Sequence, residues 1–80
     1  MKVKVLYFSQ VKDKVGKNEE EIEFEGKTLK DLVDVLVNKY PHIEDILKRS
    51  MFAVNESYET MDYNLQDNDI IAIIPPVSGG

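Results

Sequence analysis

The residues most suited to chemistry stand together at the end of the sequence, in the segment Pro75-Pro76-Val77-Ser78-Gly79-Gly80. Adjacent prolines cannot donate to a β-ladder, and they favour the stiff polyproline II conformation that directs a chain away from its domain. Gly79 and Gly80 lack a Cβ atom, so they can pass through a narrow channel into the active site of another protein. We therefore expect residues 75–80 to form a protruding C-terminal tail with a reach of roughly 20 Å.

The group that this tail would present is the carboxylate of Gly80. An α-carboxylate is ionised at neutral pH and is a poor electrophile, so it becomes reactive only when another enzyme activates it, for example as an acyl-adenylate. A sulfur nucleophile would then convert it into a thiocarboxylate, whereas an amine would yield an isopeptide-linked modifier. A frayed end without function stays open as well, because chain termini are often disordered.

No second group of catalytic residues accompanies the tail. His42 is the only histidine, and beside Pro41 we expect it on an exposed turn with no role beyond solvation. Cysteine is absent, which excludes disulfides, zinc–thiolate sites and thiol nucleophiles, so sulfur could not be carried on a side-chain thiol. Residues 67–69 read Asp-Asn-Asp like the start of a calcium loop, but Ala72 and Ser78 stand where that loop requires Gly and Glu. We therefore predict no metal site and no bound cofactor.

Size and charge narrow the classes of function further. The 80 residues make one small domain, 1–80, and at this size folding buries only roughly 60% of the surface, which leaves little room for a deep catalytic pocket. A carrier or binding module is therefore favoured over a self-sufficient enzyme. The net charge of −5 disfavours nucleic acid and suits a partner with a basic docking surface. The apolar run near the N-terminus is broken by Lys4 and is too short for a signal peptide or a membrane span, so we expect a cytoplasmic protein without membrane contact.

The elements that must position the tail follow from the spacing of apolar residues. Residues 28–40 carry a continuous helical stripe, with Thr28 as the cap and Pro41 as the stop. The unbroken apolar run 70–74 is typical of a central or parallel strand that is covered on both faces. Weaker patterns predict the remaining elements, namely strands over 2–8, 19–24, 51–55 and 58–65, a short helix over 42–49 and a polar turn over 66–69. One main helix packed across one face of a mixed sheet gives an α+β roll of the ubiquitin-like β-grasp type.

Strand parity singles out one aromatic residue near the start of the chain. Over residues 2–8 the odd-numbered side chains share one face, and the even-numbered ones, from Lys2 to Phe8, share the other. The lysines at positions 2 and 4 mark the second face as partly wet. We therefore expect Phe8 on the solvent side of the sheet unless another element covers it. The polar stretch that follows leads to the acidic outer face of the strand 19–24.

Four segments of the sequence carry a resemblance to a known family. They are Val5-Leu6-Tyr7-Phe8-Ser9-Gln10-Val11, Ala53-Val54-Asn55, Leu65-Gln66-Asp67-Asn68-Asp69 and, above all, the tail from Pro75 to Gly80. With these motifs the chain resembles the small subunits of molybdopterin synthase, within the ubiquitin-like sulfur carriers, over essentially all of its length. The Pro-Pro-Val approach to Gly-Gly is specific, because carriers of thiazole synthesis share Gly-Gly but usually lack it.

The resemblance implies a function and two partners. Gly80 would carry a terminal thiocarboxylate after activation by an ATP-dependent, ubiquitin-activating-like adenylyltransferase, which consumes the ATP. The large subunit of molybdopterin synthase would use the sulfur to build the dithiolene of molybdopterin, so the chain would donate sulfur without being catalytic alone. Family complexes bury an apolar patch beside the tail, which corresponds here to Phe8, Tyr58 and Ile74. The partner would also contact the tail residues Pro75, Pro76, Val77, Ser78 and Gly79.

Two departures from the family pattern leave the exact subfamily open. Asn68 replaces a common glycine, although Asn tolerates a left-handed turn, and Lys12-Asp13 stands where Arg-Glu is usual. The alternatives are a sulfur carrier for thiazole (thiamine) or thionucleoside synthesis, a protein modifier conjugated to lysines, and a plain interaction module.

Overall fold

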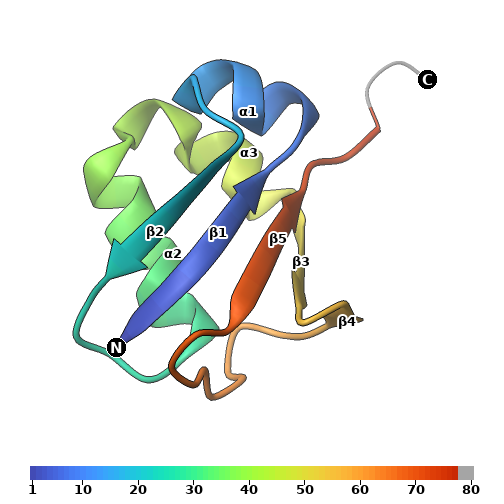
Figure 1. Cartoon of the computed structure of the whole chain (residues 1–80). Helices are drawn as coiled ribbons and strands as arrows, with labels where there is room; N and C mark the ends of the chain where they lie inside the picture. Colours follow the sequence, from blue (N-terminus) through green and yellow to red (C-terminus); the bar gives the residue numbers. More distant parts are fainter. Residues whose placement is uncertain (78–80) are drawn as a thin grey trace.

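Within residues 1–77, which the computed structural model describes, five strands form one mixed sheet in the order β2-β1-β5-β3-β4. The central strand β5 is parallel to β1, and every other neighbouring pair is antiparallel. The strands are β1 (Lys2–Tyr7), β2 (Glu19–Glu23), β3 (Met51–Val54), β4 (Ser57–Tyr58) and β5 (Ile70–Ile74). The helices are α1 (Ser9–Val15), α2 (Leu29–Lys39), the 3-10 helix η1 (Pro41–Ile43) and α3 (Glu44–Lys48). Figure 1 shows α2 crossing behind the sheet.

The main helix α2 forms as predicted, from a capping box and an apolar stripe. Thr28 Oγ1 accepts a hydrogen bond from the Asp31 backbone N–H (3.2 Å), and the Asp31 carboxylate accepts one from the Thr28 backbone N–H (3.0 Å). The backbone N–H groups of Lys27 and Thr28 hold the pKa of Asp31 below its ordinary value. No helix in residues 1–77 is both long enough and apolar enough to cross a lipid bilayer.

The core lies between the helices and one face of the sheet. Alternate residues of β1 and β5 point into it, and each of them is at most 2% exposed: Val3, Val5, Tyr7, Ile71 and Ile73. The helices contribute Val11, Leu29, Leu32, Leu36, Ile46 and Leu47. The predicted inward face of residues 2–8 is therefore confirmed.

Helix α1 was not predicted, because its residues show no apolar stripe. Val11 is its one buried side chain, so the segment reads as a polar connection in the sequence. The helix ends at Gly16, which adopts a left-handed conformation (φ 87°) and donates its backbone N–H to the carbonyl oxygen of Lys12 (2.8 Å). The predicted short helix over 42–49 corresponds to η1 followed by α3.

The predicted strand over 58–65 is wrong beyond Tyr58. After the short β4, the Glu59 N–H still donates to the Phe52 carbonyl oxygen of β3 (3.0 Å), but from Met61 onward the backbone groups bond to residues at or just before the start of α2. The N–H groups of Leu29 and Lys30 donate to the carbonyl oxygens of Tyr63 and Met61 (both 2.9 Å). The otherwise unpaired N–H groups of the first helical turn therefore fix this loop across the start of α2.

Strand β5 is central and parallel to a neighbour, as predicted, but the prediction that both of its faces are covered is wrong. Ile71 and Ile73 are fully buried, whereas Ile70 is 42% exposed and Ala72 and Ile74 are half-buried. The second face of the sheet is therefore open and apolar at its centre.

Candidate functional site

The open face of the sheet carries a row of apolar side chains at the end where the tail leaves. Met51 of β3 pairs with Ile74 of β5, and the pairing of Tyr7 with Ile73 places the next residue, Phe8, beside Ile74 on the other side. Phe8 is 46% exposed and Met51 is 55% exposed. We call Phe8, Ile74 and Met51, together with Tyr58, the open-face patch.

Tyr58 belongs to this patch but lies farther from the tail. It pairs with Ala53, which in turn pairs with Ala72, so it stands one row back and two strands away from β5. It is also 62% exposed, the largest exposed fraction in the patch. The structure therefore brings Phe8 and Ile74 together as expected, and it places Tyr58 at the patch's outer edge.

The prolines of the tail differ from the prediction that residues 75–80 protrude. Pro75 is buried and Pro76 is half-buried, and only Val77 is almost fully exposed, at 96%. The reason is strand parity, because Pro75 continues the core-facing series of Ile71 and Ile73. The other predicted site residues, 78–80 (Ser78, Gly79 and Gly80), lie outside the described residues.

Sequence reasoning missed Met51 as a patch residue. Its signal was present in the alternation around the buried residues Phe52 and Val54, which puts Met51 on the opposite face. Its place beside Ile74 depends on the register of β3 against β5, which local sequence does not contain.

Two hollows flank the open-face patch. One of about 400 Å³ is lined by Leu6, Phe8, Lys12 and Glu19 among others, and one of about 310 Å³ is lined by Met51 and Tyr58 together with Phe52, Met61 and others. A larger hollow of about 780 Å³ has an apolar floor contributed by α2, α3 and β3, and it contains no residue of the patch or of the tail. The two smaller hollows therefore adjoin the patch, one at Phe8 and the other at Met51 and Tyr58.

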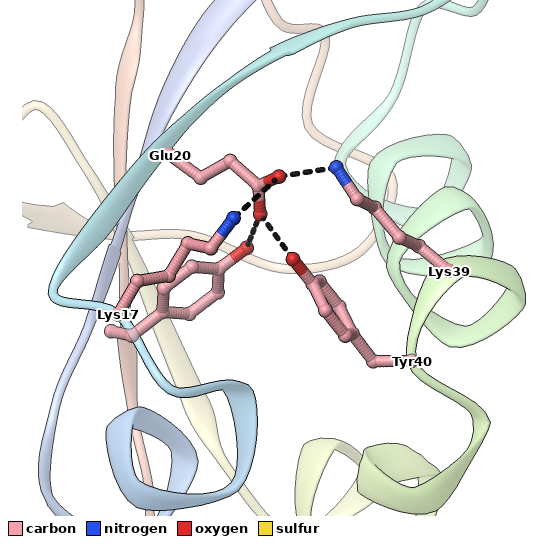
Figure 2. Close-up of polar contacts among 5 residues, drawn as sticks. Lys17, Glu20, Lys39 and Tyr40 are labelled. Atoms are coloured by element: carbon pink, nitrogen blue, oxygen red, sulfur yellow. Dashed lines mark hydrogen bonds and ion pairs between the residues drawn. The ribbon is translucent and has the colours of Figure 1, made fainter.

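A buried carboxylate fixes the end of β1 that presents Phe8. Figure 2 shows Glu20 of β2 surrounded by Lys17, Lys39 and Tyr40. The hydroxyl groups of Tyr7 and Tyr40 each donate to Glu20 Oε1 (2.8 Å), and the ammonium groups of both lysines contact Oε2. Tyr7 directly precedes Phe8, so the cluster ties this end of β1 to β2 and to the end of α2.

The surroundings of Glu20 explain its ionisation. Burial by itself would raise the pKa of this carboxyl group, but hydrogen bonds from Lys39, Tyr40 and Tyr7 and the charge of Lys39 outweigh it and lower the pKa to about 2. Burial and the neighbouring Glu20 carboxylate raise the pKa values of Tyr7 and Tyr40. Glu20 is therefore an ionised hydrogen-bond acceptor at neutral pH. Sequence analysis missed this role because it assigned the glutamates of this strand to an acidic outer face.

The other groups weighed from the sequence have structural contacts. Exposed His42 donates from Nε2 to the carbonyl oxygen of Lys14 (2.9 Å), which links η1 to α1. In the predicted polar turn, Asn68 adopts a left-handed conformation (φ 70°), and the Asp69 carboxylate accepts from the Gln66 backbone N–H (2.8 Å). Asn68 therefore supplies the conformation for which the family commonly uses glycine.

Comparison with known proteins agrees with this arrangement. The family model described as ThiS family matches residues 5–80. The chain is 41% identical over 81 residues to a protein of Dictyostelium discoideum named molybdopterin synthase sulfur carrier subunit, covering 96% of this chain and 94% of that protein.

Solved structures extend the likeness to three dimensions. A Pyrococcus furiosus chain assigned as molybdopterin converting factor subunit 1 matches with a TM-score of 0.87 and 31% identity, covering 96% of this chain and 99% of that one. A chain in the complex of subunits 1 and 2 of the molybdopterin-converting factor from Helicobacter pylori matches with a TM-score of 0.71 and 26% identity over the whole of both chains. The predicted β-grasp fold and the predicted resemblance are thus confirmed. The chain belongs to the ThiS family.

Proposed function

We propose that this chain is the sulfur carrier subunit of molybdopterin synthase in molybdenum cofactor biosynthesis. The observation that carries the proposal is the likeness, over nearly the whole chain, to a curated protein named as that subunit. The structure adds an exposed apolar patch in the row of the sheet that precedes the tail. The absence of cysteine from the sequence is consistent with sulfur held on a carboxyl group.

The proposed chemistry takes place on Gly80. Its carboxylate attacks the α-phosphate of ATP on an activating enzyme, which releases pyrophosphate and leaves an acyl-adenylate. Hydrosulfide then attacks the acyl carbon, AMP departs as the leaving group, and loss of a proton leaves the thiocarboxylate. If a persulfide supplies the sulfur instead, the product is an acyl disulfide, and a second thiol cleaves its S–S bond, releasing the thiocarboxylate and forming a new disulfide with the sulfur source. Transfer of this sulfur to the pterin precursor and hydrolysis by water restore the carboxylate. The chain contributes docking and presentation, while its partners contribute catalysis.

The proposal requires two partners at one surface. An ATP-dependent adenylyltransferase loads the tail, and the large synthase subunit unloads it. Both must reach the same terminus, and the apolar row of Phe8, Ile74 and Met51 lies at the end of the sheet from which the tail starts. Their binding to this row is therefore mutually exclusive, and the loaded carrier must leave one partner before it meets the other. We place both encounters in the cytoplasm.

The first test is conversion of the terminus. The chain is incubated with its adenylyltransferase, ATP and a sulfur source, and its intact mass is measured. We expect a gain equal to the replacement of one oxygen by sulfur. A variant with one alanine appended after Gly80 should fold with the same melting temperature and gain no mass. Equal conversion of the extended variant would refute a mechanism that depends on Gly80 as the terminus.

The second test identifies the acceptor. The loaded chain is mixed with the large subunit and the cyclic pterin precursor, and formation of the dithiolene is followed by mass spectrometry. Loss of the thiocarboxylate with dithiolene formation supports the proposal. Transfer only to a thiazole or thionucleoside enzyme, or a ladder of lysine conjugates in cell extracts, would assign the chain to one of the alternative functions instead.

A further inference from the structure

The solvent exposure of the chain rises step by step over the three residues that follow β5. Pro75 is buried, Pro76 is half-buried and Val77 is 96% exposed. Along β5 the odd-numbered residues Ile71 and Ile73 are fully buried, so Pro75 continues the core-facing side of the strand after its hydrogen-bonded ladder has ended. Pro76 continues the open side, next after Ile74. The two prolines therefore occupy different environments although they are identical and adjacent.

This difference distinguishes two parts of the tail: Pro75, which we call the anchor, and the four residues beyond Pro76, which we call the arm. The ring of Pro75 is enclosed and its φ angle is restricted by the ring, so both the position and the direction of the chain are constrained at this residue. Beyond Pro76 four residues remain up to the carboxyl carbon of Gly80, and fully extended they span at most about 14 Å. The free reach is thus shorter than the roughly 20 Å expected if all six residues protruded.

We propose that Pro75 is a positioning residue for sulfur loading and transfer: its buried ring fixes the point from which a four-residue arm delivers Gly80. The inference rests on the proposed function and names the device that presents its reacting group. It implies that each partner holds its reacting centre within about 14 Å of Pro76 when Phe8, Ile74 and Met51 are covered.

The physical reason is conformational entropy. A tail that could rotate freely at its base would sample a large volume around the domain, and it would lose this conformational entropy each time that Gly80 entered a catalytic centre. A base that is held in the core has already lost part of this entropy on folding, so the reacting geometry is reached more often, while the docking affinity is unchanged. Replacing the anchor should therefore lower kcat while leaving KM, which reports docking through the patch, unchanged.

The experiment compares a proline of the tail with a proline outside it in the adenylation and sulfur-loading reaction. In Pro75→Gly we expect kcat to fall tenfold or more, with KM within twofold of the original chain. In Pro41→Gly, which makes the same chemical change at an exposed proline of η1 outside the tail and the patch, we expect kcat within threefold. Pro75→Val returns an apolar side chain to the enclosed position and should recover kcat to within threefold. All rates are taken below the melting temperature of each variant, and Pro75→Ala replaces Pro75→Gly if the latter does not fold.

The outcomes separate this inference from the proposed function. A loss that appears in KM alone, an equal loss of kcat in Pro41→Gly, or no recovery in Pro75→Val would each overturn the anchor. Failure of the original chain to gain sulfur from any partner preparation would instead overturn the proposed function.

Discussion

Replacing Glu20 by Gln tests whether the buried carboxylate holds β1, β2 and the end of α2 together. The Glu20 side chain is only 9% exposed and contacts two lysines and two tyrosine hydroxyls, so solvent screens its charge weakly. The fall of its pKa from 4.5 to about 2 corresponds to about 3 kcal/mol of unfolding free energy at pH 7. A domain of this size has a total of about 4–12 kcal/mol, so the change is large.

The sign of the pH dependence follows from the lowered pKa. Because the folded state binds this proton less tightly than the unfolded state, the contribution is complete above about pH 5 and is lost as the pH falls towards 2. At pH 3 roughly 2 kcal/mol of it should be gone. We expect Glu20→Gln to lower the unfolding free energy by about 2–3 kcal/mol at pH 7 and to be nearly as stable as the original chain at pH 2.

Urea unfolding followed by tyrosine fluorescence at pH 7, 5, 3 and 2 measures this directly. The matched control is Glu21→Gln, because Glu21 is an exposed glutamate of the same strand and its removal should change the unfolding free energy by less than about 0.5 kcal/mol. The reasoning fails if Glu20→Gln matches the original chain at pH 7, or if its stability falls as steeply between pH 5 and pH 2.

Two further substitutions test the patch and the hairpin. Phe8→Ala should weaken binding to the large synthase subunit at least tenfold in calorimetric titration. Because the side chain is half-exposed, the same change should lower the unfolding free energy by no more than about 1 kcal/mol. The control is Tyr63→Ala, which removes a partly buried aromatic side chain outside the patch and should leave the affinity unchanged; an equal loss of affinity there would contradict docking through Phe8. Glu56→Gly should raise the unfolding free energy by about 0.5–1 kcal/mol in urea, because Glu56 adopts a left-handed conformation (φ 73°) in the two-residue turn between β3 and β4, and a decrease would show that the turn is not strained.

Elements with many regularly spaced apolar residues were predictable from the sequence, and those with few were not. In α2 the capping box and three buried leucines identify the helix from local sequence, and in β1 the alternation identifies both faces, including exposed Phe8. Helix α1 packs through buried Val11 and partly buried Val15, and two apolar residues are too few to distinguish a helix from a polar connection. The segment after Tyr58 looked like a strand because its backbone partners, at the start of α2, lie about thirty positions earlier in the chain.

The candidate site shows the same division. The alternation of side chains along a strand is sufficient to place Phe8, and it also places Glu20 on the side of Ile22 and Phe24. The alternation within one strand does not give the register between neighbouring strands. Only the pairing of β3 and β1 with β5 sets Met51 and Phe8 on either side of Ile74. Likewise, only the packing of α2 brings Lys39 and Tyr40 to Glu20.

The parity of β5 explains how one short strand serves both packing and delivery. Its core-facing series ends in buried Pro75, and its open-facing series ends in half-buried Pro76 beside the patch residue Ile74. A partner that covers Phe8, Ile74 and Met51 therefore contacts, at Ile74, the strand from which the arm continues, so the docking surface and the base of the arm lie on one sheet. Under the proposed function, the fold thus sets the point from which the four residues beyond Pro76 start, and this part of the positioning is complete once the protein has folded.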